Sequence, residues 1–202
     1  MRPPLPRLHA VTDERIARRA DLDDAARQLA EVGGANLALH ARGRALTGFD
    51  HYDLAVHLSN VPSALFVNDR LDIALALNAT GVQLGVGSLP VSAARHLRPT
   101  WWIGKSVHDL AEADTAKAEG ADYLLVGPVY ATPTHPDRAP LGLEPLRAIA
   151  RLGLPMIAIG GVTAARAHEV KAAGAHGVAA IRALWDAEDP AAAARQMLEE
   201  LQ

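Results

Sequence analysis

The segments AIGGV (158–162) and GAHGVAAIRAL (174–184) are the best guide to the fold, because each joins a short apolar run to glycines beside a helical segment. Both apolar runs are predicted to form buried strands. The pair Gly160-Gly161 lets the backbone approach a ligand closely, since glycine has no Cβ atom. Two successive strand ends with exposed amides, the second leading into Ile181-Arg182, predict a cradle for a phosphate group.

The same alternation of apolar runs and amphipathic helical stretches continues outward through the whole chain, as expected of βα units. Eight such units without a long insertion predict the α/β class and a single-domain (β/α)8 TIM barrel over residues 1–202. The alternative is an open doubly wound sheet, which normally carries a glycine-rich loop after its first strand; Val11-Thr12-Asp13 is not such a loop. The predicted strands cover 8–12, 36–40, 64–67, 81–84, 101–104, 123–126, 156–159 and 177–180.

Composition excludes several classes of function. The net charge is -3, and the 20 basic and 23 acidic residues form no basic stripe, so we expect no nucleic-acid or membrane binding. The chain has no cysteine, which excludes disulfides, thiol nucleophiles and thiolate metal sites. The first residues, MRPPLPRLHAVTD, lack the apolar run of a signal peptide, so a cytoplasmic location is expected.

Polar and cationic residues follow the predicted strands. Barrel active sites are built from the loops at the carboxyl ends of the strands, so these residues should meet on one face. A face rich in cations favours an anionic ligand. The cations expected there are Arg42, Arg44, Arg70, Lys105 and Arg182, with Asn68 and Ser106 beside them. The histidines at 51, 57, 96, 108, 168 and 176 are expected on helices or at strand starts, away from this face.

Seven motifs, in order and at matching intervals, resemble one superfamily of thiamine biosynthesis. It contains thiamine phosphate synthase and its relative thiazole tautomerase, both (β/α)8 barrels, and the resemblance covers essentially the whole chain. The motifs are LHAVTD (8–13), FVNDRLDIAL (66–75), GVQLG (81–85), IGKSVHD (103–109), GADYLLVGPVYATPTHP (120–136), PMIAIGGVT (155–163) and GAHGVAAI (174–181).

The resemblance to the synthase implies a reaction between a pyrimidine diphosphate and a thiazole phosphate, with release of pyrophosphate. In that pattern two aspartates hold Mg²⁺. The first matches Asp69, whereas Ser88 stands at the place of the second carboxylate. The threonine-rich loop of the synthase is similar to Thr132-Pro133-Thr134-His135.

The resemblance to the tautomerase rests on the run HARGR (40–44) and on VQLGVGSLP (82–90). The general acid/base histidine of that branch is replaced here by Pro128. The main interpretation is therefore a thiazole tautomerase-like isomerase without a cofactor, in which His135 transfers the proton and His40 is the second candidate. Arg42 would hold the substrate carboxylate, and Ser106 and Thr134 would orient the ring.

Two alternatives to this interpretation stay open. One is the synthase itself, with Mg²⁺ at Asp69. The other is a catalytically inactive regulator that binds thiazole phosphate. In every case the expected partner is a small-molecule thiazole phosphate, and a homo-oligomer is a further possibility. The substrate and phosphate contacts are predicted to be Arg42, Arg44, Asn68, Ser106, Thr132, Thr134, Gly160, Gly161, Ile181 and Arg182.

Overall fold

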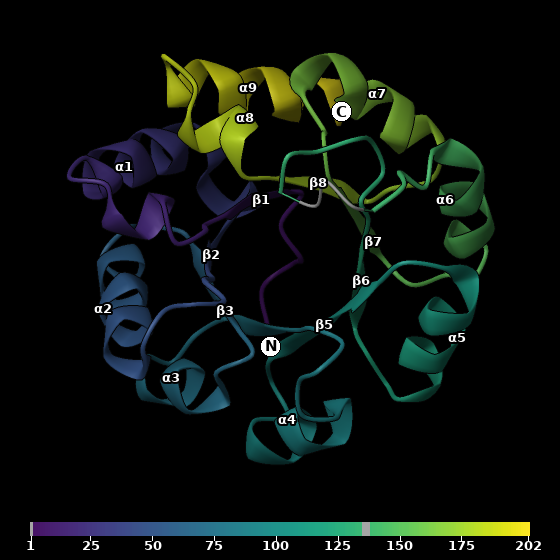
Figure 1. Cartoon of the computed structure of the whole chain (residues 1–202), viewed down its shortest axis with the longest axis horizontal. Helices are drawn as coiled ribbons and strands as arrows, with labels where there is room; N and C mark the ends of the chain where they lie inside the picture. Colours follow the sequence, from purple (N-terminus) through teal and green to yellow (C-terminus); the bar gives the residue numbers. More distant parts are fainter. Residues whose placement is uncertain (1, 135–137) are drawn as a thin grey trace.

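Eight parallel strands close into a barrel in the computed structural model, which describes residues 2–134 and 138–202 (Figure 1). The strands pair in chain order, and β1 pairs with β8 to close the ring, with Leu8 opposite Val178. The predicted (β/α)8 barrel is confirmed. The strands are β1 (Leu8–Val11), β2 (Leu37–Ala41), β3 (Ala64–Asn68), β4 (Gly81–Leu84), β5 (Trp102–Val107), β6 (Tyr123–Val126), β7 (Met156–Ile159) and β8 (Gly177–Ala180).

Helices surround the barrel on its outer side (Figure 1). Helix α1 packs one stripe of apolar residues against the barrel: Leu22, Ala25, Ala26, Leu29, Ala30 and Gly33 are buried. No helix within the described ranges is long and apolar enough to cross a membrane. The α-helices are α1 (Leu22–Gly33), α2 (Gly48–Ser59), α3 (Leu71–Ala76), α4 (Val91–Leu97), α5 (Leu110–Ala118), α6 (Leu143–Ala150), α7 (Ala164–Ala172), α8 (Arg182–Trp185) and α9 (Pro190–Glu200), and the 3-10 turns are η1 (Ile16–Arg18) and η2 (Gly34–Asn36).

Strand β5 extends three residues beyond its predicted end. Lys105, Ser106 and Val107 continue the parallel pairing with β6, so Lys105 and Ser106 lie in the strand rather than in a loop. Polar side chains were assigned to loops in the prediction, but the last residues of a barrel strand border the open end and can be polar. The same reason explains why Asn68 belongs to β3.

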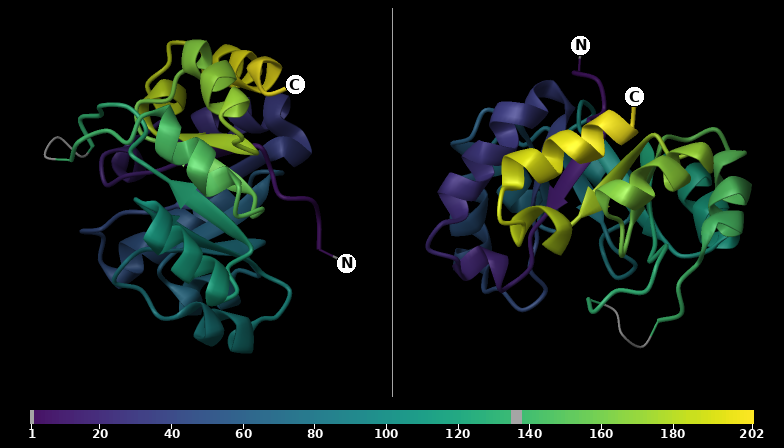
Figure 2. Two further views of the ribbon diagram at one scale, coloured as in Figure 1. Left: turned by 90° about the vertical axis from the view of Figure 1, so that its right-hand side faces the viewer. Right: turned by 90° about the horizontal axis from the view of Figure 1, so that it is seen from above.

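The N-terminal segment lies against the amino ends of the strands. Trp102 Nε1 donates to the carbonyl of Pro3 at 2.9 Å, and the Arg2 guanidinium lies 3.6 Å from the centre of the Trp102 ring. Leu5 is buried and accepts a bond from His176 Nε2 at 3.1 Å. Figure 2 shows this segment leaving the barrel on the side opposite the loop that follows β6. The carboxyl ends of the strands therefore form the open face.

The barrel interior is filled by aromatic and imidazole rings. His9, His40, Phe66 and Tyr123 are fully buried, and the rings of His40 and Phe66 stack with their centres 5.0 Å apart. Gly104 makes room for this cluster, since a Cβ atom there would lie 2.1 Å from Cζ of Tyr123.

We expect Gly104→Ala to lower the free energy of unfolding by about 1–3 kcal/mol, because the added methyl group overpacks the interior. Urea denaturation monitored by tryptophan fluorescence measures this loss. Gly87→Ala is the matched control, because a Cβ atom there would meet nothing within 4 Å. Equal stability of the two variants would show that the interior can move aside for a methyl group.

Candidate active site

A cavity of about 1200 Å³ opens at the carboxyl ends of the strands. Its walls come from the loops after β2 to β8 and from the last residues of β3 and β5. Most of the residues predicted from the sequence line it: Arg42, Arg44, Asn68, Asp69, Ser106, Thr132, Thr134, Gly160, Gly161, Ile181 and Arg182. His135, the first choice for proton transfer, lies outside the described residues.

One end of the cavity is formed by the turn after β7 and the start of α8. Gly160 and Gly161 have φ values of +97° and +64°. A Cβ atom on Gly161 would lie 2.7 Å from the carbonyl oxygen of Ala131, so the turn requires glycine for packing as well as for ligand access. Ile181 precedes the first turn of α8, where backbone N–H groups have no partner within the helix. This end of the cavity can bind a phosphate group.

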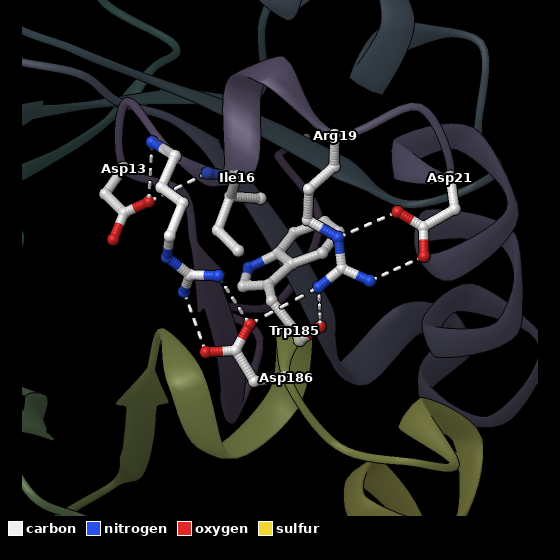
Figure 3. Close-up of polar contacts among 7 residues, drawn as sticks. Asp13, Ile16, Arg19, Asp21, Trp185 and Asp186 are labelled. Carbon is white, nitrogen blue, oxygen red and sulfur yellow. Dashed lines mark hydrogen bonds and ion pairs between the residues drawn. The ribbon is translucent and has the colours of Figure 1, made fainter.

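The loop after β1 holds α8 in place across the seam between β1 and β8 (Figure 3). Arg15 donates two hydrogen bonds to the Asp186 carboxylate, at 2.8 and 2.7 Å. Arg19 donates to the carbonyl of Trp185 and to both carboxylate oxygens of Asp21. These contacts fix the C-terminal end of the short helix whose other end borders the cavity.

The loop after β6 borders the same end of the cavity. Val129 N and Tyr130 N donate to the carbonyls of Ile159 and Gly160, both at 2.9 Å, so the start of this loop continues alongside β7. Thr132 and Thr134 follow and line the cavity. The two threonines therefore lie close to the end formed by the Gly160-Gly161 turn and α8.

Asp69 marks the opposite side of the cavity. Its backbone is left-handed, with φ at +63°, and its N–H donates to the carbonyl of Gln83. Oδ1 accepts hydrogen bonds from Gly85 N at 2.9 Å and from the hydroxyl of Ser88. No described residue donates to Oδ2, and the described residues contain no group of three acidic, histidine or cysteine side chains that could hold a metal. One carboxylate and one hydroxyl therefore face the cavity together.

The cavity wall is cationic. Its charged side chains within the described ranges are one carboxylate, Asp69, and four guanidinium groups, those of Arg42, Arg44, Arg138 and Arg182. Burial, followed by the neighbouring charge of Arg44, lowers the pKa of Arg42, which remains a cation at neutral pH. Such a wall favours a ligand with several negative charges.

Two predicted cations do not line the cavity. Arg70 is bound to the carboxylate of Asp72, with Nε 2.8 Å from Oδ1. Lys105 Nζ donates to the carbonyl of Gly85 at 3.0 Å, so it supports the loop after β4. Arg138 was not singled out in the sequence, and the only signal for it was the long loop in which it lies.

His40 lies beneath the cavity and does not line it. Its Nε2 is 2.8 Å from Nδ1 of His9, and its Nδ1 is 3.1 Å from the side chain of Asn68. Burial lowers the pKa of His40 to about 4, while the bond to Asn68 raises it in part. Burial and the nearby His40 also lower the pKa of His9 well below its usual value. Both rings are therefore neutral at pH 7.

The expectation for His108 is wrong, because this histidine lines the cavity. It directly follows β5, whose end lies further along the chain than predicted. The sequence signal that could have found it is the spacing of two residues from Ser106, which places both side chains on the same face of an extended chain.

The comparisons with known proteins agree with one another. The family model described as thiamine monophosphate synthase matches residues 8–184. A thiamine-phosphate synthase from Chloroflexus aurantiacus is 43% identical, over 95% of this chain and 90% of that protein. A thiamine-phosphate synthase from Methanoculleus marisnigri is 45% identical, over 96% of this chain and 94% of that protein. The structure of a thiamine phosphate pyrophosphorylase from Pyrococcus furiosus superposes with a TM-score of 0.82 at 32% identity, over 96% of this chain and 95% of that one.

These findings correct the main functional interpretation. The curated relatives are named synthases, which are transferases, so the tautomerase-like isomerase is wrong and the alternative synthase reading is supported. The run HARGR was misleading because its first residue, His40, lies buried under Asn68.

The neutral histidine pair should make stability depend on pH. In the unfolded chain both imidazoles bind protons below about pH 6.5, whereas the buried His40 does so only near pH 4. We therefore expect the free energy of unfolding to fall as the pH falls from 7 to 5, by up to about 1.4 kcal/mol per pH unit for each histidine. Urea denaturation at a series of pH values measures the slope. His40→Gln should have a shallower slope, whereas the exposed His96→Gln should keep that of the wild type; identical slopes in all three proteins would contradict the assignment.

Proposed function

This chain belongs to the thiamine monophosphate synthase family, and from that premise we propose that it joins a pyrimidine diphosphate to a thiazole phosphate, forming thiamine phosphate and releasing pyrophosphate. The observation that carries the proposal is a single cavity that has groups suited to anions at two ends. One end is the turn at Gly160-Gly161 with the start of α8, and the other is the wall around Arg42, Arg44 and Asp69. A reaction between two phosphorylated substrates needs both ends, whereas an isomerase acting on one phosphate ester needs one.

The thiazole phosphate is assigned to the end at β7 and β8. Backbone N–H groups at Gly160, Gly161, Ile181 and Arg182 are well suited to a phosphate monoester, because helix starts and glycine turns present donors without bulk. Arg182 adds a positive charge at the same end. The neighbouring Thr132 and Thr134 supply hydroxyl groups that can orient the ring.

The pyrimidine diphosphate is assigned to the end at β2, β3 and β5. Arg42 and Arg44 provide guanidinium groups, and each guanidinium group can donate two parallel hydrogen bonds to phosphate oxygens. Asn68 and Ser106 line the floor between the two ends and can hydrogen-bond the pyrimidine or its diphosphate. The role of these four side chains is to stabilise the negative charge that builds up on the diphosphate as its bond to carbon breaks.

The residues present fit a Mg²⁺ ion held together with the substrate. Mg²⁺ is commonly bound by one or two carboxylates plus phosphate oxygens, and Asp69 offers the oxygen Oδ2 beside the hydroxyl of Ser88. When bound there, the ion would neutralise charge on the diphosphate. The protein's own contribution is to hold the Asp69 side chain toward the cavity through Gly85 N and Ser88.

Location and assembly remain expectations. The proposed substrates are small phosphate esters, and we expect a cytoplasmic enzyme that can form a homo-oligomer.

Purified protein should form thiamine phosphate from the two substrates and Mg²⁺, as detected by oxidation to fluorescent thiochrome phosphate. Asp69→Asn should lower the rate by about 10²–10³-fold, because several kcal/mol of charge stabilisation at the leaving group is lost. Asp72→Asn is the matched control, since Asp72 is bound to Arg70 and does not line the cavity. Binding of thiazole phosphate without product would contradict the proposal and favour the inactive regulator.

Ser88→Asp should strengthen Mg²⁺ binding by about 10-fold, because a second carboxylate raises the charge of the ligand set. Calorimetric titration of the protein with Mg²⁺, without substrate, measures this change; the wild type should bind the ion weakly. Ser92→Asp adds the same charge on the exposed start of α4 and should leave the affinity unchanged. Tight Mg²⁺ binding by the wild type would show that other residues hold the ion.

A further inference from the structure

His108 is a cavity-lining histidine that the functional assignment above does not use. Its Nδ1 is 2.9 Å from Oε2 of Glu112, and its own backbone N–H donates to the same oxygen at 2.7 Å. No described residue bonds to its other ring nitrogen, Nε2, and the side chain is 25% exposed. The ring therefore has one nitrogen engaged with a carboxylate and one available to a ligand.

The start of α5 fixes the orientation of this ring. Asp109 caps the helix by accepting a hydrogen bond from Glu112 N at 2.8 Å, and Glu112 in turn reaches back to His108. This reciprocal arrangement resembles a capping box, which holds both side chains in one conformation. Since a carboxylate only accepts hydrogen bonds, Nδ1 must carry a proton, and any acid–base exchange must take place at Nε2.

Bonded contacts join the strand that precedes His108 to the diphosphate end of the cavity. Strand β5 pairs with β4, with Lys105 opposite Leu84, and Lys105 Nζ binds the carbonyl of Gly85. Gly85 N in turn binds Asp69 Oδ1. The loop after β5 lies two strands from Asp69, which follows β3, and two strands from Gly160, which follows β7, so the link to the diphosphate end rests on these bonds.

We propose that His108, oriented by Glu112, is the general acid for the departing diphosphate, an inference that rests on the synthase function proposed above. The carbon–oxygen bond of the pyrimidine diphosphate breaks, and its electron pair stays on the diphosphate oxygen. The proton on Nε2 passes to the diphosphate and leaves a neutral imidazole. The remaining proton stays on Nδ1, hydrogen-bonded to Glu112. The lone pair of the thiazole nitrogen forms the new bond to carbon, so no oxidant or further reactant is needed.

In the doubly protonated ring that the transfer requires, the carboxylate of Glu112 would lie against the positive charge. In other acid–base sites a carboxylate likewise orients the catalytic histidine. Among the residues that the structure describes, the charged groups that share the cavity with His108 are Arg42, Arg44, Asp69, Arg138 and Arg182.

The test combines turnover, chemical rescue and product binding. His108→Ala should lower the turnover number by about 10²-fold, the usual size of general acid help. Free imidazole in the assay should restore part of the rate, because the open cavity admits it in place of the lost ring. Calorimetric titration with inorganic pyrophosphate and Mg²⁺ should show about 10-fold weaker binding than in the wild type. His96→Ala, an exposed histidine on α4, is the matched control and should match the wild type in all three measurements.

A wild-type rate and wild-type pyrophosphate affinity in His108→Ala would overturn the inference while leaving the synthase function intact. A lowered rate that imidazole does not restore, with unchanged pyrophosphate affinity, would also overturn it. If the wild type binds pyrophosphate but forms no thiamine phosphate, the proposed function fails and the acid role fails with it. Should His108→Ala fail to fold, as seen by circular dichroism, Glu112→Gln replaces it; that variant keeps an acceptor for Nδ1 but removes the negative charge beside the ring, so it should lose turnover, and a wild-type rate would contradict the role of that charge.

Discussion

The parallel pairing of β1 with β8 is the contact on which the site depends. Without it, eight parallel strands form an open sheet and the loops after β1 and β8 lie at opposite edges. With Leu8 opposite Val178, those loops become neighbours, and Arg15 can bind Asp186 across the seam. That ion pair is partly exposed and contributes little stability by itself. What the ion pair does is fix the position of the short helix α8, whose first turn borders the cavity.

Closure also determines how charge is distributed around the cavity. The carboxyl ends of all strands meet on one face, so guanidinium groups from the loop after β2 and from α8 share a cavity with the carboxylate that follows β3. In the proposed reaction, anions at β7–β8 and at β2–β3 would be held at two ends of the same cavity. The two proposed substrates, each carrying phosphate, would then meet between these charged groups.

The fold was largely predictable from the sequence, because buried parallel strands are continuous apolar runs that glycines separate from helices. Prediction failed at the carboxyl end of β5, where Lys105 and Ser106 interrupt the apolar run but continue the pairing. Because of that error, His108 was not predicted to lie at the open face.

The cavity lining was predictable where it followed a strand end directly, as at Asn68 and Gly160, but side-chain direction was not. His40 and Arg42 lie two residues apart, yet the first is buried against His9 and the second lines the cavity. The burial of His40 removes the second candidate for proton transfer from the cavity wall, whereas the branch of the family was corrected by the relatives, which are named synthases.

A crystal structure of the protein with thiamine phosphate, pyrophosphate and Mg²⁺ tests the central claim, one cavity with two anion-binding ends, most directly. The account predicts the thiamine phosphate ester against Gly160-Gly161 and the first turn of α8, with the pyrophosphate beside Arg42, Arg44 and Asp69. Both anions at the same end, or pyrophosphate bound outside the cavity, would contradict it.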